Sequence, residues 1–301
     1  MVIDWIENGV ELKFDSEPHP FVLNNREVTL QEQRFLDNEI LSLLKRGYIV
    51  ESCDSQKPLC ISPVYCVPKK NGKFRLINNL RKLNSFCKLI AFQYEDVNCV
   101  MEIVKSGDKL VTVDIKDGFY HMPVAECSQK YLGFKWRNTT YMWAVLPFGL
   151  SVSPYIICKT IRQAIKILRG AGFRLSVYVD DFILCADEHS IDFVRETFLT
   201  LLCDLGLHVN WDKSNLVPST EQQHLGHIMA TNNKDGYVWI RVPSDRIRKV
   251  KHDINRAIKS KALTARALAR ICGQLISMSK AVLPAKLLLR NLYWVLRAGT
   301  S

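Results

Sequence analysis

The sequence predicts an α+β fold in which an antiparallel sheet is followed by a segment made only of helices. Runs of β-forming residues come in pairs separated by turn residues, which is typical of antiparallel hairpins. Other apolar residues recur at helical spacing, and after Pro243 only this helical pattern remains. The chain has 301 residues, of which 48% are hydrophobic, so it can bury a sizeable core.

The composition favours a nucleic-acid partner. The 41 Lys and Arg residues outnumber the 30 Asp and Glu residues, and the resulting formal net charge of +11 attracts polyanions. The ten cysteines contain no Cys-x-x-Cys pair, which predicts reduced thiols in an intracellular protein. No stretch is apolar enough to cross a bilayer and no secretion signal is recognisable at the N-terminus, so we expect no membrane partner.

The first elements are predicted from capping and turn residues. Residues 1–28 show no clear periodicity and are expected to form a loosely packed or extended arm. The segment Thr29-Leu-Gln-Glu32 is a capping box before an apolar stripe that ends at Gly47, which predicts an amphipathic helix. Residues 62–70 and 73–79 are β-forming runs joined by an Asn-Gly dipeptide, so they predict a basic hairpin.

The central part predicts further strands and a helix. Residues 110–115 form a short apolar run, which predicts a buried strand with a carboxylate near its end. Residues 130–136 and 141–146 flank a polar turn and predict a second hairpin. Pro154 then opens a helical pattern that runs through Arg169.

The last part combines a third hairpin with helices. Residues 175–179 and 182–186 predict antiparallel strands that meet at Asp180-Asp181, and a helix follows over residues 188–205. Residues 243–298 predict a three-helix bundle whose helices are capped or opened by Ser244, Thr264 and Pro284. The exposed faces of this bundle are expected to carry an excess of basic residues: Arg246, Arg248, Lys249, Lys251, Arg256, Lys259 and Lys261.

Three carboxylates at predicted strand ends point to metal-dependent chemistry. They are Asp114, Asp180 and Asp181. Like charges at the edge of a buried sheet repel one another, and a divalent cation commonly neutralises such a cluster. Two ions roughly 3.5 to 4 Å apart serve phosphoryl transfer in this way. An isolated Asp-Asp dipeptide is more often an ordinary polar turn, but here a third carboxylate lies on another strand.

Six motifs in order resemble the reverse transcriptases of retroelements, over almost all of residues 29–300. Residues 62–84 resemble the fingers hairpin of that family, and residues 113–121 resemble its first palm motif. Leu-Pro-Phe-Gly at 146–149 is similar to the template-positioning motif, and Tyr-Val-Asp-Asp at 178–181 to the catalytic hairpin. The motifs that close the palm are matched by Gly-Leu-His-Val-Asn-Trp-Asp-Lys at 206–213 and His-Leu-Gly-His at 224–227.

Within that family, the residues of these motifs most resemble those of gypsy-type long-terminal-repeat elements and of the tyrosine-recombinase elements of the DIRS group. Phe148 stands where enzymes of infectious retroviruses have a polar residue, as in gypsy-like elements. Residues 152–154 and 284–294 carry the similarity to the DIRS group. The chain stops at Ser301 without a ribonuclease H domain, so we expect a polymerase module alone.

The resemblance implies a right-hand polymerase fold. The expected parts are an N-terminal arm at 1–28, fingers at 29–90 and 122–152, a palm with an antiparallel sheet at 91–121 and 153–242, and a helical thumb at 243–301. The implied activity is RNA-directed and DNA-directed DNA polymerisation, which extends a primer by two-metal-ion nucleotidyl transfer. Two Mg²⁺ ions, with Mn²⁺ as a substitute, an RNA or DNA template with its primer, and deoxynucleoside triphosphates are the implied cofactors and partners.

The resemblance also assigns residues to roles. The metals would be held by Asp114, Asp180, Asp181 and the main-chain carbonyl of Ile115, and Lys213 would donate a proton to the leaving pyrophosphate. The nucleotide would contact Lys69, Lys70, Arg75, Asp117, Gly118, Phe119, Phe148, Gly149 and Tyr178. The primer and template would contact His224, Leu225, Gly226, Arg248, Lys251 and Lys259.

Several of these residues have simpler alternatives. The basic hairpin and the basic helices could be ordinary solvated faces, and Lys213 could be a surface lysine. Phe119 would exclude a 2′-hydroxyl by its bulk, or it would be a core residue. His224 and His227 favour a primer contact or plain surface over a zinc site.

Two other functions remain open from the sequence. A catalytically silent, domesticated nucleic-acid-binding scaffold would be expected to have lost part of the acid set, which is intact here. An RNA-dependent RNA polymerase would be expected to accept the 2′-hydroxyl with a small or hydrogen-bonding residue, and Phe119 argues against that. The oligomeric state, the priming mechanism and the natural template are left open.

Overall fold

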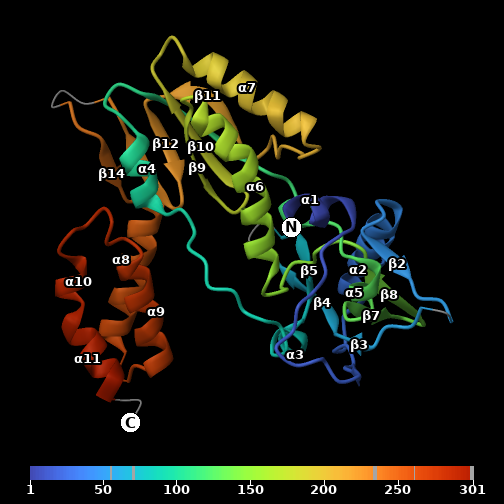
Figure 1. The fold of residues 1–301 in the computed structure, drawn as a ribbon. Helices are drawn as coiled ribbons and strands as arrows, with labels where there is room; N and C mark the ends of the chain where they lie inside the picture. The colour runs from blue at the N-terminus through green and yellow to red at the C-terminus, as the bar shows by residue number, and fades with distance from the viewer. Residues whose placement is uncertain (55, 70–71, 233–235, 261, 299–301) are drawn as a thin grey trace. The chain divides into compact units, whose positions relative to one another are not determined.

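The structure is a computed structural model that describes residues 1–54, 56–69, 72–232, 236–260 and 262–298 (Figure 1). The chain divides into two compact units, each discontinuous in sequence. Unit 1 comprises Met1–Gln93, Lys116–Ile167 and Gly206–His208. Unit 2 comprises Tyr94–Ile115, Leu168–Leu205 and Val209–Ser301. Within the described ranges, no helix is both long and apolar enough to span a membrane.

Unit 1 is built on a five-stranded sheet with the order β1-β3-β7-β8-β2 and on a separate β4-β5 hairpin. The β1–β3 and β3–β7 pairs are parallel, and the β7–β8 and β8–β2 pairs are antiparallel. The strands are β1 (Phe21–Val22), β2 (Ile49–Glu51), β3 (Cys60–Ile61), β4 (Val64–Pro68), β5 (Phe74–Asn78), β7 (Gly133–Trp136) and β8 (Thr139–Trp143).

The helices of unit 1 include the one predicted from the capping box. Thr29 Oγ1 accepts the N–H of Glu32 and the Glu32 carboxylate accepts the N–H of Thr29, which confirms the box at the start of α2 (Leu30–Lys45). Leu36, Ile40 and Leu43 form the buried stripe. The other helical elements are α1 (Val2–Glu7), α3 (Arg81–Asn84), η1 (Gly118–His121), α5 (Glu126–Gln129) and α6 (Ser153–Gly170), which runs on into unit 2.

The N-terminal segment packs more closely than expected. It contributes α1 and β1, and Val10, Leu12 and Phe21 are buried. The N–H of Val10 donates to the carbonyl of Pro123, so the segment is tied to unit 1 by main-chain bonds. Of the two predicted alternatives, loose packing is contradicted and an extended segment is retained, because these few apolar residues pack without a helical or alternating period. Only long-range contacts reveal them.

Unit 2 is built on a four-stranded antiparallel sheet with the order β11-β6-β10-β9, next to a three-stranded β12-β13-β14 sheet in the same unit. The strands are β6 (Lys109–Asp114), β9 (Arg174–Tyr178), β10 (Asp181–Ala186), β11 (Asn215–Ser219), β12 (Glu221–His224), β13 (His227–Ala230) and β14 (Trp239–Arg241). The helices α4 (Val97–Ile103) and α7 (Ile191–Asp204) contact this sheet. Phe198 of α7 meets Phe182 of β10 in the core.

The C-terminal part of unit 2 is helical, as predicted. It consists of α8 (Ser244–Lys259), α9 (Ala265–Ile276), α10 (Ala285–Leu288) and α11 (Arg290–Ala298). Thr264 caps α9 by accepting the N–H of Ala267. Two details differ from the prediction. Pro243, not Ser244, stands at the N-cap of α8, and the third helix is divided at Leu289.

The hairpin turns are tighter than predicted. In the β7–β8 hairpin the turn is Arg137-Asn138, with Arg137 at φ 52°, so Thr139 and Thr140 belong to a strand. In the β9–β10 hairpin Val179 lies at φ 61° in the turn, and Asp181 already pairs with Tyr178. Two-residue hairpin turns require positive φ, which overrides the β-forming preference of Val179.

Candidate active site

The register of the four-stranded sheet brings the predicted acids to one edge. Asp181 pairs with Asp114 across β10 and β6, so the last residue of β6 lies opposite the first residue of β10. Asp180 precedes Asp181 in the β9–β10 turn. The N–H of Ile115 donates to the carbonyl of Asp180 at 2.8 Å, which extends the pairing of β6 beyond its last residue.

Asp114 and Asp180 form an electrostatically coupled pair. Burial raises the pKa of the Asp180 carboxyl, and the negative charge of Asp114 raises it further. Among the side chains that the structure describes, no three His, Cys, Asp or Glu groups come together as one ion-binding cluster. The charge of Asp181 also raises the pKa of Asp180, so all three predicted acids act on one another electrostatically.

The Asp181 carboxylate also contacts the ring of His224. Its Oδ1 atom lies 3.3 Å from Nδ1 of His224, whose side chain has an exposed fraction of 0%. Neither ring nitrogen of His224 completes a hydrogen bond, although the carboxylate is within ion-pair distance. A plain surface histidine, one of the two alternatives from the sequence, is therefore excluded, and the buried ring offers no exposed atom to a primer.

A turn between residues 210 and 214 surrounds Asp114 with polar groups. Asn210 donates from Nδ2 to Oδ1 of Asp114 at 2.9 Å, and its main-chain N–H donates to the Asp114 carbonyl at 2.8 Å. Ser214 Oγ accepts the N–H of Asp114 at 3.0 Å. Lys213 Nζ lies 3.3 Å from Oδ1 and 3.5 Å from Oδ2 of the same carboxylate.

These residues fit the divalent cations that the sequence predicts. Hard cations prefer carboxylate and carbonyl oxygens, which are the groups that Asp114, Asp180 and Ile115 supply. Burial and then the charge of Asp114 raise the pKa of Asp180, so a cation bound there would stabilise its ionised form. The ammonium of Lys213 beside Asp114 is a positive charge already drawn to this position.

The candidates for the nucleotide site are divided between the units. Lys69 and Arg75 are exposed on the β4–β5 hairpin of unit 1, and Lys70 lies outside the described residues. Phe119 is half-buried and meets Phe148 edge-to-face, with ring centroids 4.9 Å apart. Tyr178 of unit 2 packs against Tyr94 at 5.0 Å.

Two backbone conformations support the nucleotide candidates of unit 1. Asp117 has φ 54°, and its carboxylate is paired with the Arg46 guanidinium at 3.1 Å. Gly118 follows it and is buried. Gly149 has φ 94°, and a Cβ atom there would lie 3.2 Å from the carbonyl oxygen of Asn78. A side chain at Gly149 would therefore be strained by both its backbone angle and its neighbour.

The primer and template candidates lie on the β12–β13 turn and on α8. Leu225 and Gly226 form this turn with φ of 47° and 71°. Arg246 donates to the carbonyl of Gly226 at 2.8 Å, so α8 is tied to the turn. The three predicted contact residues of α8, Arg248, Lys251 and Lys259, are all exposed.

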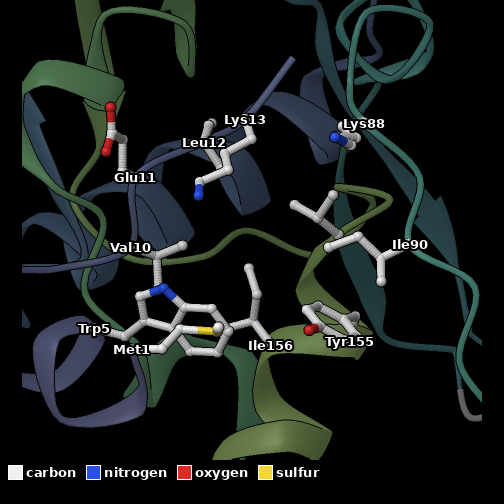
Figure 2. Close-up of a pocket in the computed structure, with 11 residues that line it drawn as sticks. Met1, Trp5, Val10, Glu11, Leu12, Lys13, Lys88, Ile90, Tyr155 and Ile156 are labelled. Atoms are coloured by element: carbon white, nitrogen blue, oxygen red, sulfur yellow. The ribbon is translucent and has the colours of Figure 1, made fainter. Parts of the chain in front are cut away.

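Cavities lie in both units of the described structure, including a polar one in unit 2 and an apolar one in unit 1. A polar cavity of about 570 Å³ in unit 2 is lined by residues that include Asp181, Lys213 and His224. An apolar cavity of about 160 Å³ in unit 1 is lined by residues that include Trp5, Ile90 and Ile156, which Figure 2 draws as sticks. Of these two cavities, only the polar one includes predicted site residues.

Sequence reasoning missed several polar neighbours of the site. Asn210 and Ser214 flank Lys213 in the motif at 206–213, so their place in that motif was the available signal. Arg46 lies 71 positions before Asp117, and no local pattern connects them. Arg246 was expected on an exposed basic face, but its guanidinium donates to the carbonyl of Gly226 and so ties α8 to the β12–β13 turn.

Comparison with known proteins identifies the family of this chain. The family profile described as reverse transcriptase (RNA-dependent DNA polymerase) matches residues 67–229. The Pro-Pol polyprotein of feline foamy virus is 27% identical over 67% of this chain and 18% of its own length. The Pol polyprotein from transposon opus of Drosophila melanogaster is 26% identical over 65% of this chain and 20% of its own length. The chain thus spans about a fifth of these relatives.

Solved structures resemble the fold. The foamy viral protease-reverse transcriptase in complex with dsDNA has a TM-score of 0.71 and 23% identity, over 87% of this chain and 50% of that one. The same viral protein in complex with an RNA/DNA hybrid has a TM-score of 0.72 and 20% identity, over 97% of this chain and 38% of that one. This likeness concerns the fold, and it confirms the predicted fold class.

Proposed function

Because the chain belongs to the reverse transcriptase (RNA-dependent DNA polymerase) family, we propose that it extends a primer along an RNA or DNA template. The observation that carries the proposal is the coupled pair of Asp114 and Asp180 at adjacent strand ends, with the Lys213 amine 3.3 Å from Asp114. A structural turn would not require a buried carboxylate beside a second one. A metal-dependent nucleotidyl transfer does.

Asp114, Asp180, Asp181 and the carbonyl of Ile115 would hold two divalent cations, Mg²⁺ with Mn²⁺ as a substitute. When bound, such ions activate the attacking hydroxyl and neutralise the charge of the leaving phosphates. The chain itself supplies the orientation of the carboxylates, through the β6–β10 register and the 210–214 turn. Lys213 is exposed enough to move from Asp114 and donate a proton to the leaving pyrophosphate.

The substrate is a deoxynucleoside triphosphate. Phe119 is supported by Phe148, so its ring is held in place beside Gly118 and can exclude a 2′-hydroxyl by its bulk. Lys69 and Arg75 supply charge for the triphosphate on the β4–β5 hairpin. The exposed basic residues of α8 supply phosphate contacts that do not depend on sequence.

We further propose a gypsy-like or DIRS-group origin and an intracellular location. Phe148 and the sequence Val152-Ser-Pro154 support the origin. Burial raises the pKa of Cys60 to about 11 and of Cys185 to about 12, so these two thiols stay protonated at neutral pH. The absence of any Cys-x-x-Cys pair and these protonated, buried thiols support a reducing compartment.

The test is primer extension on a heteropolymeric RNA template, with Mg²⁺ or Mn²⁺ and with each class of nucleotide. We expect metal-dependent extension with deoxynucleotides on RNA and on DNA. A protein that binds primer–template but extends it with neither metal would be a silent scaffold. Extension that prefers ribonucleotides would indicate an RNA polymerase.

A further inference from the structure

We propose that Asn210 is a positioning residue that fixes the Asp114 carboxylate, and that with Ser214 it forms a clamp joining Asp114 to Lys213. The inference rests on the proposed function, since it concerns the carboxylate that would hold the metals. Neither residue was assigned a role from the sequence. Both lie in the turn that follows α7 and precedes β11.

The clamp holds Asp114 at three points. The Asn210 side chain donates from Nδ2 to Oδ1 at 2.9 Å, and the Asn210 main chain donates to the Asp114 carbonyl at 2.8 Å. Ser214 Oγ accepts the N–H of Asp114 at 3.0 Å. The main-chain donor, the main-chain acceptor and one carboxylate oxygen of Asp114 are thus all bound by the same turn.

The need for such a clamp follows from the sheet. Asp114 is the last residue of β6, and β11 pairs with β6 only from Asn215, opposite Thr112. The main-chain groups of Asp114 on that side therefore lie beyond the strand ladder. The 210–214 turn replaces the missing strand, because an unpaired main-chain group in a half-buried position is costly.

The same turn positions Lys213. The Asn210 carbonyl accepts the N–H of Lys213 at 3.1 Å and that of Ser214 at 2.9 Å, and Ser214 Oγ donates back to it at 2.8 Å. The predicted proton donor and the predicted metal ligand are therefore held by one short segment. The turn fixes the main chain of Lys213 next to Asp114, while the exposed Lys213 side chain stays able to move.

The Asn210 amide suits this role better than a cation would. It is neutral, so it orients Asp114 and leaves its negative charge to the metal. Lys213, by contrast, is 65% exposed, and an exposed ion pair is weak enough to break when a divalent cation arrives. Asn210 is half-buried, and its bond to Asp114 can persist through that exchange.

The side chain of Asn210 can be removed without removing the turn. The bonds that close the turn go to the Asn210 carbonyl, and these do not involve Nδ2. Asn210→Leu keeps the size and branching of the side chain and deletes only its polar atoms. Asn215→Leu is the matched control, since Asn215 donates to Gln222 at 2.9 Å and makes no bond to Asp114.

The experiment measures Mn²⁺ binding directly, from the free-Mn²⁺ electron paramagnetic resonance signal, on the chain bound to a primer–template with a terminated primer. Asn210→Leu should raise the Mn²⁺ dissociation constant by about 10- to 100-fold, the usual cost of losing a group that orients a metal ligand. Primer–template affinity and melting temperature should change little. Asn215→Leu should leave Mn²⁺ binding within about twofold of the wild type.

The outcomes separate this inference from the proposed function. Loss of Mn²⁺ binding in Asp114→Asn, together with extension by the wild type, establishes the site itself. If that holds and a folded Asn210→Leu binds Mn²⁺ within about twofold of the wild type, the inference is overturned. If Asn210→Leu does not fold, Ser214→Ala and Ser214→Thr provide the test. Ser214→Ala, which lacks the hydroxyl, should weaken Mn²⁺ binding, whereas Ser214→Thr, which keeps it, should not. Equal Mn²⁺ binding by these two variants would overturn the clamp.

Discussion

At the scale of single residues, the site depends on charges that are held close together. Asp180 is the clearest case, because burial and the nearby Asp114 both oppose its ionisation. A group in that environment is destabilising unless a cation compensates it. The neighbouring Asp181 has a different environment, beside the buried ring of His224. Two adjacent acids in one sequence motif are therefore expected to contribute unequally.

Substituting Asp114→Asn or Asp180→Asn should reduce primer extension by at least about a thousandfold, because each change removes a charge that both ions need. Primer–template binding should survive, since the exposed basic residues that would make phosphate contacts lie on α8. Steady-state extension and filter binding on the same protein preparations check this. A variant that polymerised within tenfold of the wild type would remove that residue from the metal site.

Phe119→Ala should relax the selection against ribonucleotides. Phe119 is half-buried against Phe148, so the truncation opens space without touching the carboxylates. We expect the ratio of ribonucleotide to deoxynucleotide incorporation to rise at least about tenfold. That rise corresponds to the loss of about 1.4 kcal/mol of steric discrimination. Single-nucleotide insertion with matched deoxy and ribo substrates measures the ratio. An equal loss of both activities would instead place Phe119 in the core.

At the scale of elements, the β9–β10 hairpin is held by a half-buried acid, Glu95, that precedes α4. Glu95 accepts two hydrogen bonds from Arg169 at the end of α6, and it also accepts the Ser176 hydroxyl and the Val177 N–H of β9. Burial tends to raise the pKa of Glu95, but these bonds outweigh it and the pKa lies below its ordinary value. Strand β9 is therefore anchored two residues before Val179 and the acids.

Glu95→Gln should destabilise the protein by about 2 kcal/mol at neutral pH, the scale of hydrogen bonds to a charged group. A lowered pKa in the folded state means that this contribution is present above the unfolded pKa and is lost as the pH falls through the folded pKa. The difference between variant and wild type should therefore shrink in acid. Denaturant unfolding at several pH values measures it.

The matched control for that measurement is Glu188→Gln. Glu188 pairs with Lys109 at 3.2 Å but is 73% exposed, so its loss should cost less than about 0.5 kcal/mol. Equal effects of the two substitutions would contradict the anchoring role of Glu95.

At the scale of the whole molecule, part of the net charge of +11 is concentrated on one helix, α8. Helix α8 has exposed basic residues along its length, and Val250 is the residue of this helix that is buried. Contacts between such a face and phosphates release counterions and do not read bases. We therefore expect this helical segment to bind nucleic acid of any sequence.

Neutralising Arg248, Lys251 and Lys259 together should weaken primer–template binding equally for all sequences. The slope of log affinity against log salt should fall by about 2 to 3, because roughly one counterion is released for each phosphate contact. Fluorescence anisotropy over a salt series measures both quantities. The control neutralises three exposed lysines of unit 1, Lys45, Lys57 and Lys166, and an identical slope in both triple variants would show that α8 is merely solvated.

The sequence by itself determined the elements that depend on near neighbours. The capping box of α2, the strand β6 and the three segments of helix after Pro243 all follow from residues a few positions apart. The α+β class and the placement of the acids at strand ends follow from these. Positive φ at Arg137 and Val179 escaped prediction because their side chains disfavour it, and the hairpin geometry imposed it.

Only the tertiary structure decided how the acids differ from one another. The bond from Asn210 to Asp114 spans 96 positions, and the contact of His224 with Asp181 joins two separate sheets of unit 2. Periodicity and capping act over a few residues, so they carry no information about such pairs. The physical reason is that burial and charge depend on what the folded chain brings together, and these determine the ionisation and orientation of each carboxylate.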